Sequence, residues 1–314
     1  MKLVIGTRGS ELALAQSHWV RRQLLDDADN GVDTVELKII KTRGDKILDV
    51  ALSKVGGKGL FVKELEIALL DGEVDLAVHS MKDMPSELPE GLVLGGVPSR
   101  EDPRDAWVCP DGASVTPLAD LPLGATVGTS SLRRQAQLLA GRPDLHVVPI
   151  RGTVGTRLAK LDAGQEGMVA IVLACAGLKR LGLQSRIHHA FAPSEMLPAV
   201  GQGALAIELR GGDERVAAAI AGLDHPATRW ATLAERAFLG SLEGGCQVPI
   251  GGHAEIDGDE LRIRGFVSRP DGRDALRLDA RGAAADAIAI GRRLGDAMIA
   301  AGAEAILEAG RVAS

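Results

Sequence analysis

The stretch VGTSSLRRQAQLLAG, residues 127–141, decides the fold class. It reads as the end of a β-strand, then three hydroxyl side chains at positions 129 to 131, then an amphipathic helix. Arg133 and Arg134 fall in the first turn of that helix. Strand, short turn and helix make one βα unit, the building block of a largely parallel sheet.

The same alternation extends in both directions from this stretch. Towards the N-terminus, LVIGT (3–7), VELKIIK (35–41), VDLAVHS (74–80) and LVLGGVPS (92–99) read as strands with helical runs between them. The alternation stops at SREDPRD (99–105) and restarts with DAWVC (105–109), ATVGTS (125–130), LHVVPIRG (145–152) and MVAIVLACAG (168–177). The sequence therefore predicts two α/β domains.

The last third of the chain has a different pattern. A helical stretch ends at EGGC (243–246), and three strand candidates follow, separated by the turns DG (257–258) and PDG (270–272). One long alanine-rich helix is expected at the end. We therefore predict a third, smaller α+β domain with a three-stranded antiparallel sheet.

Composition excludes several classes of protein. The 314 residues are 46% hydrophobic and 25% charged with a net charge of -6, which is ordinary for a globular protein of two or three domains. We expect no membrane span and no signal peptide, because apolar runs are short and only three apolar residues lie between Lys2 and Gly6. The acidic balance and 2% aromatics disfavour nucleic-acid binding.

Cysteine and histidine usage bounds the chemistry further. Cys109, Cys175 and Cys246 have no paired spacing, which disfavours a disulfide framework and a metal site and fits the cytoplasm. Cys109 and Cys175 lie in apolar runs read as strands, and His188 and His189 are adjacent, which on a helix would point them apart. Cys246 lies after two glycines, which leave its thiol approachable.

Arginines recur where strands end and helices begin. Arg8 follows the first strand, Arg133 and Arg134 open a helix, and RGTVGTR places Arg151 and Arg157 one βα unit later. Helix N–H groups and guanidinium forks favour an anion, and ligands of open α/β sheets bind beyond the carboxyl ends of strands. Any one of these arginines could instead be a solvated surface residue; the recurrence favours a cleft for a polyanion.

Asp83 is the acidic exception. In VHSMKDMP, residues 78–85, it and Lys82 come just past a strand end. A carboxylate in an arginine-lined cleft could accept a hydrogen bond from the substrate and stabilise developing positive charge. The alternative is a turn-forming aspartate.

Eight strings together resemble the porphobilinogen deaminase (hydroxymethylbilane synthase) family: HSMKDMP, KVGGKGLFVKELE, REDPRDA, VGTSSLRRQAQL, RGTVGTRLAKL, AGLKRLG, LPAVGQGA and EGGCQVPIG. They cover nearly the whole chain in order. The resemblance implies two periplasmic-binding-protein-like α/β domains, the first completed by a returning strand at ALAIELR (204–210), with boundaries at residues 1–99 plus 200–216, 100–199 and 217–314. It also implies a transferase of haem biosynthesis, and we expect that transferase to be a cytoplasmic monomer.

The resemblance also implies the reaction and its residues. Four porphobilinogen molecules are joined head to tail with loss of ammonia, on a dipyrromethane cofactor bound through a thioether to Cys246. Asp83 matches the catalytic aspartate, and Lys54 and Lys58 lie in a segment that resembles a mobile lid. The remaining matches are Ser80, Lys82, Thr129, Ser131, Arg133 and Arg134 for the cofactor, and Arg8, Arg151, Arg157 and Arg180 for substrate carboxylates.

Two departures from the family and one alternative remain open. Gly9 and Glu11 stand where many relatives have Gln and Pro, and Thr153 replaces a commoner Asn. A non-catalytic binder of a small polyanion is the alternative function, which EGGCQVPIG disfavours. Replacing Arg133 or Arg151 by Leu is expected to reduce cofactor loading or turnover while changing the melting temperature by only a few degrees, as for surface charges.

Overall fold

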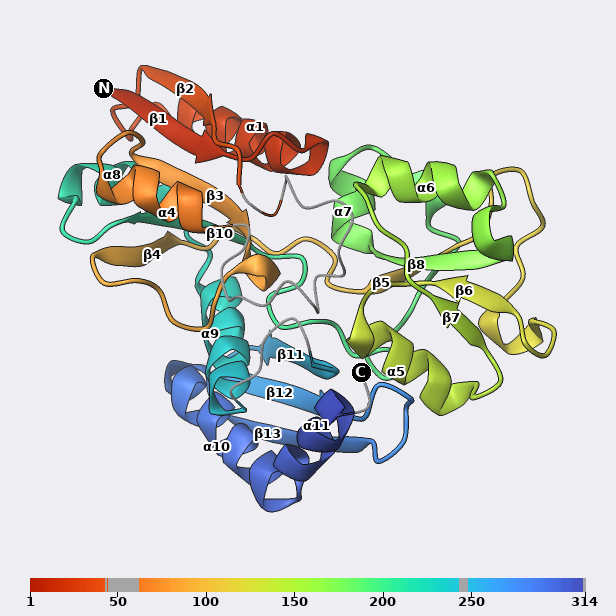
Figure 1. The fold of residues 1–314 in the computed structure, drawn as a ribbon. Helices are drawn as coiled ribbons and strands as arrows, with labels where there is room; N and C mark the ends of the chain where they lie inside the picture. Colours follow the sequence, from red (N-terminus) through yellow and green to blue (C-terminus); the bar gives the residue numbers. More distant parts are fainter. Residues whose placement is uncertain (43, 45–61, 243–247, 313–314) are drawn as a thin grey trace. The chain divides into compact units, whose positions relative to one another are not determined.

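The computed structural model describes residues 1–42, 44, 62–242 and 248–312. Three separate sheets organise these residues (Figure 1). The chain divides into two compact units, Met1–Glu101 with Ala204–Trp230, and Asp102–Gly203 with Ala231–Ser314. Within the described residues, no helix has the length and apolar character needed to cross a membrane.

The first unit holds a five-stranded sheet of order β2-β1-β3-β10-β4. Its elements are β1 (Lys2–Thr7), α1 (Glu11–Asp26), β2 (Thr34–Ile39), α4 (Lys63–Leu70), β3 (Leu76–Ser80), β4 (Leu92–Gly96), β10 (Leu205–Arg210) and α8 (Glu214–Ile220). The first three strands in the order are parallel, and β10 runs antiparallel to both β3 and β4. The expected returning strand is therefore confirmed.

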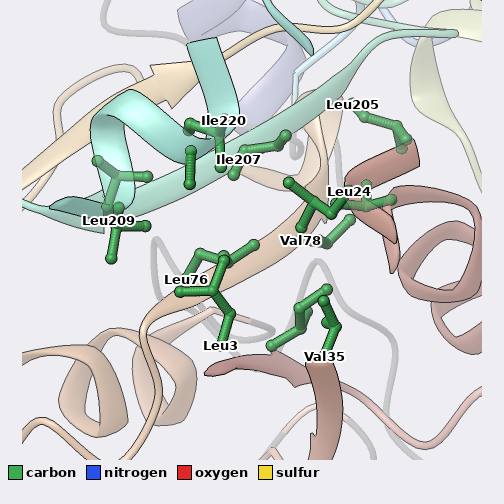
Figure 2. Packing of buried hydrophobic residues seen from close by; sticks show 13 residues of the cluster. Leu3, Leu24, Val35, Leu76, Val78, Leu205, Ile207, Leu209 and Ile220 are labelled. Carbon is green, nitrogen blue, oxygen red and sulfur yellow. The ribbon is translucent and has the colours of Figure 1, made fainter. Parts of the chain in front are cut away.

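Aliphatic side chains explain why this sheet is covered on both faces. On one face, strand residues such as Leu76, Val78 and Ile207 pack with Leu24 of α1 and Ile220 of α8 (Figure 2). On the other face, Leu65 and Leu69 of α4 pack against Ala77. Burial on both faces explains the nearly continuous apolar runs of the central strands.

The second unit contains the other two sheets. The α/β part has order β7-β6-β8-β5-β9. Its elements are β5 (Asp105–Val108), β6 (Thr126–Gly128), α5 (Leu132–Gly141), β7 (His146–Val148), α6 (Val154–Asp162), β8 (Ala170–Ala174), α7 (Cys175–Arg180) and β9 (His189–Ala190). As in the first unit, three parallel strands are followed by an antiparallel one, here β5.

The antiparallel sheet β11-β12-β13 follows helix α9 (Pro226–Ser241), which begins in the first unit. Its strands are Ile250–Asp257, Glu260–Val267 and Leu276–Ala283, and α10 (Ala287–Ala300) and α11 (Ala303–Val312) complete the chain (Figure 1). The predicted fold class, two α/β sheets and a three-stranded antiparallel sheet, is confirmed.

Three local predictions were wrong. The strand expected to reach residue 177 ends at Ala174, and Cys175 begins α7. His189 lies in the short strand β9, where the sequence was read as helix. The terminal helix is two helices, because Gly302 between them has φ of +96°, a left-handed conformation that interrupts a helix.

Candidate functional site

A pocket at the carboxyl ends of β1 and β3 brings together three residues predicted for the site. Arg8, Ser80 and Asp83 line it, with Ser10 and Gln16 of the α1 region. Ser10 caps α1 by accepting the Ala13 N–H, and Gln16 Nε2 donates to Ser80 Oγ at 2.8 Å. Asp83 is exposed at the end of a single 3-10 turn, Met81–Asp83.

Lys82 lies in the same turn and is half-buried. The turn follows β3 directly, and the Met81 N–H donates to Ala204 O at 3.0 Å, just before β10. The returning strand therefore fixes the backbone that presents Asp83. The departures near Arg8 are accommodated, since Ser10 supplies the cap and Glu11 places a negative charge in the first helical turn.

In the second unit, the hydroxyl groups predicted after β6 organise the start of α5. Ser131 is the N-cap residue, and its Oγ accepts the Arg134 N–H. Thr129 is buried, and its Oγ1 accepts the Ser131 N–H at 3.2 Å. These local bonds explain why a helix begins at this point of the sequence.

Arg133 and Arg134 are not surface charges, so the reason for expecting a small stability change for Arg133→Leu is wrong. Their residues are 4% and 6% exposed. Arg133 Nη1 donates to Asp105 Oδ2 at 2.6 Å and Arg134 Nε donates to Asp105 Oδ1 at 2.9 Å. Removing Arg133 would delete a buried hydrogen bond to the Asp105 carboxylate and a second one to Leu197 O, and the loss of a hydrogen bond to a charged group typically costs about 1.5–3 kcal/mol.

Electrostatics keeps Asp105 ionised. Burial by itself raises the pKa of this carboxyl, but the charges of Arg133 and Arg134 outweigh it and hold the pKa well below its usual range. One N–H donor of this cluster makes no hydrogen bond to the described residues. Arg133 Nε is buried and has no hydrogen-bond partner among the described residues.

The other predicted arginines lie at neighbouring strand and helix ends of the same α/β part. Arg151 is half-buried after β7, and Thr153, the departure from the family pattern, caps α6 by accepting the Thr156 N–H. Arg157 Nε donates to Gly152 O at 2.9 Å. Arg180 Nη2 donates to Gly203 O at 2.7 Å. Replacing Asn by Thr therefore leaves the helix cap intact.

The cysteines separate into two kinds. Cys109 and Cys175 are buried, and burial is the main cause that raises the pKa of the Cys175 thiol to about 12, so this thiol is a poor nucleophile. Cys246, and the lid residues Lys54 and Lys58, lie outside the described residues.

Sequence reasoning missed a buried polar cluster beside the pocket. His79 of β3 and Glu208 of β10 form a 2.9 Å contact between Nε2 and Oε2, with side chains 3% and 0% exposed. Glu66 of α4 is also buried, and its pKa is raised, first by burial and then by the charge of Glu208. A buried histidine in an apolar run was the available signal.

Fold and site together define an α/β protein with arginines at its strand ends and a carboxylate in its pocket, a class suited to anionic ligands. Residues 3–218 match the family model of the porphobilinogen deaminase dipyromethane cofactor binding domain, and residues 230–300 match the porphobilinogen deaminase C-terminal domain. Over 308 residues the chain is 52% identical to porphobilinogen deaminase of Moorella thermoacetica, covering 98% of this chain and 96% of that protein. The chain belongs to the porphobilinogen deaminase family.

Solved structures with similar folds include two solute-binding proteins. The L-cystine solute receptor of Neisseria gonorrhoeae has a TM-score of 0.38 and 15% identity, covering 75% of this chain and 90% of that one. The aliphatic sulphonate binding protein SsuA of Escherichia coli has a TM-score of 0.38 and 16% identity, covering 77% and 75%. These likenesses are distant, and the family assignment does not depend on them.

Proposed function

We propose that this chain is a hydroxymethylbilane synthase, a transferase of tetrapyrrole and haem biosynthesis. It joins four porphobilinogen molecules head to tail, releasing four molecules of ammonia, and water completes the linear hydroxymethylbilane. The primer is a dipyrromethane held covalently by Cys246. Family membership over nearly the whole chain supports the reaction. Cytoplasmic location and a monomeric state belong to the proposal on the basis of the sequence.

The observation that carries this proposal is the pocket that holds Asp83 with Arg8 and Ser80. Porphobilinogen carries two carboxylates, which guanidinium groups can bind. It also carries a pyrrole N–H, which can donate a hydrogen bond to a carboxylate. As ammonia leaves, positive charge develops on the pyrrole. A carboxylate fixed beside it stabilises that charge more in the transition state than in the ground state.

The residues near α5 fit an acidic cofactor. Arg133 Nε is a buried donor that lacks a partner among the described residues, and an acid side chain of a dipyrromethane would supply the acceptor. Thr129 and Ser131 directly precede α5 and Arg134 lies in its first turn, whereas Lys82 follows β3 in the first unit. The bound primer supplies the pyrrole ring that is extended.

Substrate and lid assignments follow the family pattern. Arg8, Arg151, Arg157 and Arg180 all lie at strand or helix ends, where they would bind the carboxylates that accumulate as the product grows. Lys54 and Lys58 would belong to the lid. Cys246 is the proposed attachment point, and the buried state of Cys109 and Cys175 supports that choice.

Intact mass and product analysis test this function. The purified protein should carry a dipyrromethane adduct, and mass spectrometry after proteolysis should locate this adduct on Cys246. Incubation with porphobilinogen should release ammonia and hydroxymethylbilane. Cys246→Ser should fold without adduct or activity, because a hydroxyl is a far poorer nucleophile than a thiol near neutral pH. Cys109→Ala should keep both. An unmodified protein that binds porphobilinogen without consuming it would be a binding protein.

Asp83→Asn tests the role of the carboxylate. Reconstituted with cofactor, this variant should keep its fold and lose at least about 10²-fold in turnover, within the range for acid-base and electrostatic residues. Glu87→Gln, an exposed neighbour on the same connection, is the matched control. Turnover of Asp83→Asn within a factor of about three of the parent would exclude Asp83 from the mechanism.

A further inference from the structure

We infer that Asp105 is a positioning residue: it aims Arg133 at the cofactor and fastens residues 197–202, which contact the strand β11. The inference rests on the proposed function. Asp105 opens β5 and is 0% exposed. Its carboxylate accepts from three side chains of two other segments, namely Arg133 Nη1 at 2.6 Å, Arg134 Nε at 2.9 Å and Gln202 Nε2 at 2.9 Å.

The two arginines use different edges of their guanidinium groups. Arg134 directs Nε and Nη2 at Asp105 Oδ1, at 2.9 and 2.7 Å, and Nη1 at Val172 O, at 2.9 Å. Towards the described part of the chain, Arg133 donates only from Nη1, to Asp105 Oδ2 at 2.6 Å and to Leu197 O at 2.7 Å. The parallel N–H fork of a guanidinium, formed by Nε and Nη2, is the edge that binds a carboxylate at two points.

Asp105 binds Arg133 only at Nη1, so the fork formed by Nε and Nη2 of Arg133 is available to a ligand. Two bonds from Nη1 fix the plane of the guanidinium, and Nε, on the opposite edge, has no partner among the described residues. Because Asp105 also offsets one of the two adjacent positive charges, the pair can stay buried. An asparagine would match the shape but would present an amide N–H to donors.

The same network reaches the strand that follows the cofactor cysteine. Gln137 brackets Leu197, donating to its carbonyl at 3.1 Å and accepting its N–H at 2.7 Å. The next residue, Pro198, accepts the Gly252 N–H of β11 at 3.0 Å. Gln202 completes the segment by donating to Pro103 O at 2.7 Å as well as to Asp105.

This continuity gives Asp105 two consequences for the cofactor. It orients the guanidinium that would bind an acid side chain, and it holds the segment 197–202 on which the start of β11 lies. Both contacts lie within the second unit. A merely structural carboxylate would stabilise the empty and the loaded protein equally, whereas a positioning residue stabilises the loaded protein more.

The test compares cofactor-free and loaded protein. Cofactor-free protein is produced in a host unable to make porphobilinogen and then incubated with porphobilinogen, while intact mass records the adduct. Asp105→Asn should load at least tenfold more slowly, measured well below its melting temperature. The rise in melting temperature on loading should fall to less than half that of the parent, because a covalently attached group stabilises the folded state only through the contacts that it makes there.

Asp144→Asn is the matched control, since Asp144 accepts from Arg142 at 2.8 Å at the far end of α5. It should keep the parent's loading rate and thermal increment. If Asp105→Asn does not fold, Gln202→Met takes its place in the test. We expect this variant to show smaller decreases in the loading rate and in the thermal increment. An unchanged loading rate and increment in the variant that folds would overturn the inference, whereas failure of the parent itself to load would overturn the proposed function.

Discussion

Glu66 shows how single residues couple the first unit to pH. The pKa of this buried carboxyl is raised from 4.5, by burial first and by the charge of Glu208 second, so the folded state holds its proton more tightly than the unfolded state does. Its contribution to stability is complete below pH 4.5 and is lost as pH rises through the raised pKa.

Glu66→Gln should therefore change the pH dependence of stability. The free energy of unfolding of the parent should fall relative to that of the variant as pH rises from 4.5 towards neutrality, because glutamine stays neutral and avoids the burial of a charge. Urea unfolding at several pH values measures this. Glu90→Gln, at an exposed position, is the control and should track the parent. Parallel curves for Glu66→Gln and the parent would contradict the assignment.

For single residues, the sequence predicted the place of a residue relative to strands and helices better than it predicted burial and contacts. VHSMKDMP was enough to place Lys82 and Asp83 just past a strand end, where both lie, and Asp83 lines the pocket with Ser80, the last residue of that strand. Burial of Arg133 was not predictable, because its partner Asp105 is 28 residues away and belongs to another strand. For the same reason the contact between His79 and Glu208, 129 residues apart, left no local pattern.

For helices, strands and turns, local features were again predicted from the sequence, whereas long-range packing was not. The turns DG and PDG were predicted and do join the strands of the antiparallel sheet, because glycine there takes the positive φ that tight turns require. The sequence did not predict that the second turn would pack on α5. A Cβ at Gly272 would lie 2.4 Å from Ala140 N and 2.7 Å from Ala136 O.

Gly272→Ala and Gly258→Ala form a matched pair of variants. Both residues have positive φ, +80° and +56°, but a Cβ at Gly258 would meet nothing within 4 Å. Gly258→Ala should cost about 1 kcal/mol, the price of the left-handed conformation alone. Gly272→Ala should cost at least about 3 kcal/mol, because the helix backbone must also move. If urea unfolding gave equal decreases in the free energy of unfolding for the two variants, the turn at Gly272 would not be packed against α5.

At the scale of the whole molecule, the chain leaves the first unit at residue 101 and returns at residue 204. The return was expected from the family resemblance, and its physical importance comes from the sheet. β3 and β4 each pair with β10 and not with one another. The strand that joins them is therefore supplied only after the second α/β part has been made.

A fragment experiment follows from this topology. Residues 1–101 alone lack β10 and α8, and with them Leu205, Ile207, Leu209, Val216 and Ile220 of the core. They should fail to give a cooperative urea transition. Residues 1–101 joined to 204–230 should fold cooperatively, through a flexible linker of about 20 residues with a relaxed span of about 25 Å.

The joined fragment also recovers polar contacts that close the unit. Asp224 accepts the Val97 N–H at 2.8 Å, and Arg229 donates to Gly95 O at 2.8 Å. Ile207→Asn in the joined fragment is the control for specific packing, because it places an amide in a fully buried site of the sheet and should abolish the transition. A cooperative transition from residues 1–101 alone, equal in midpoint to that of the joined fragment, would mean that β10 adds to the first unit without being needed to form it.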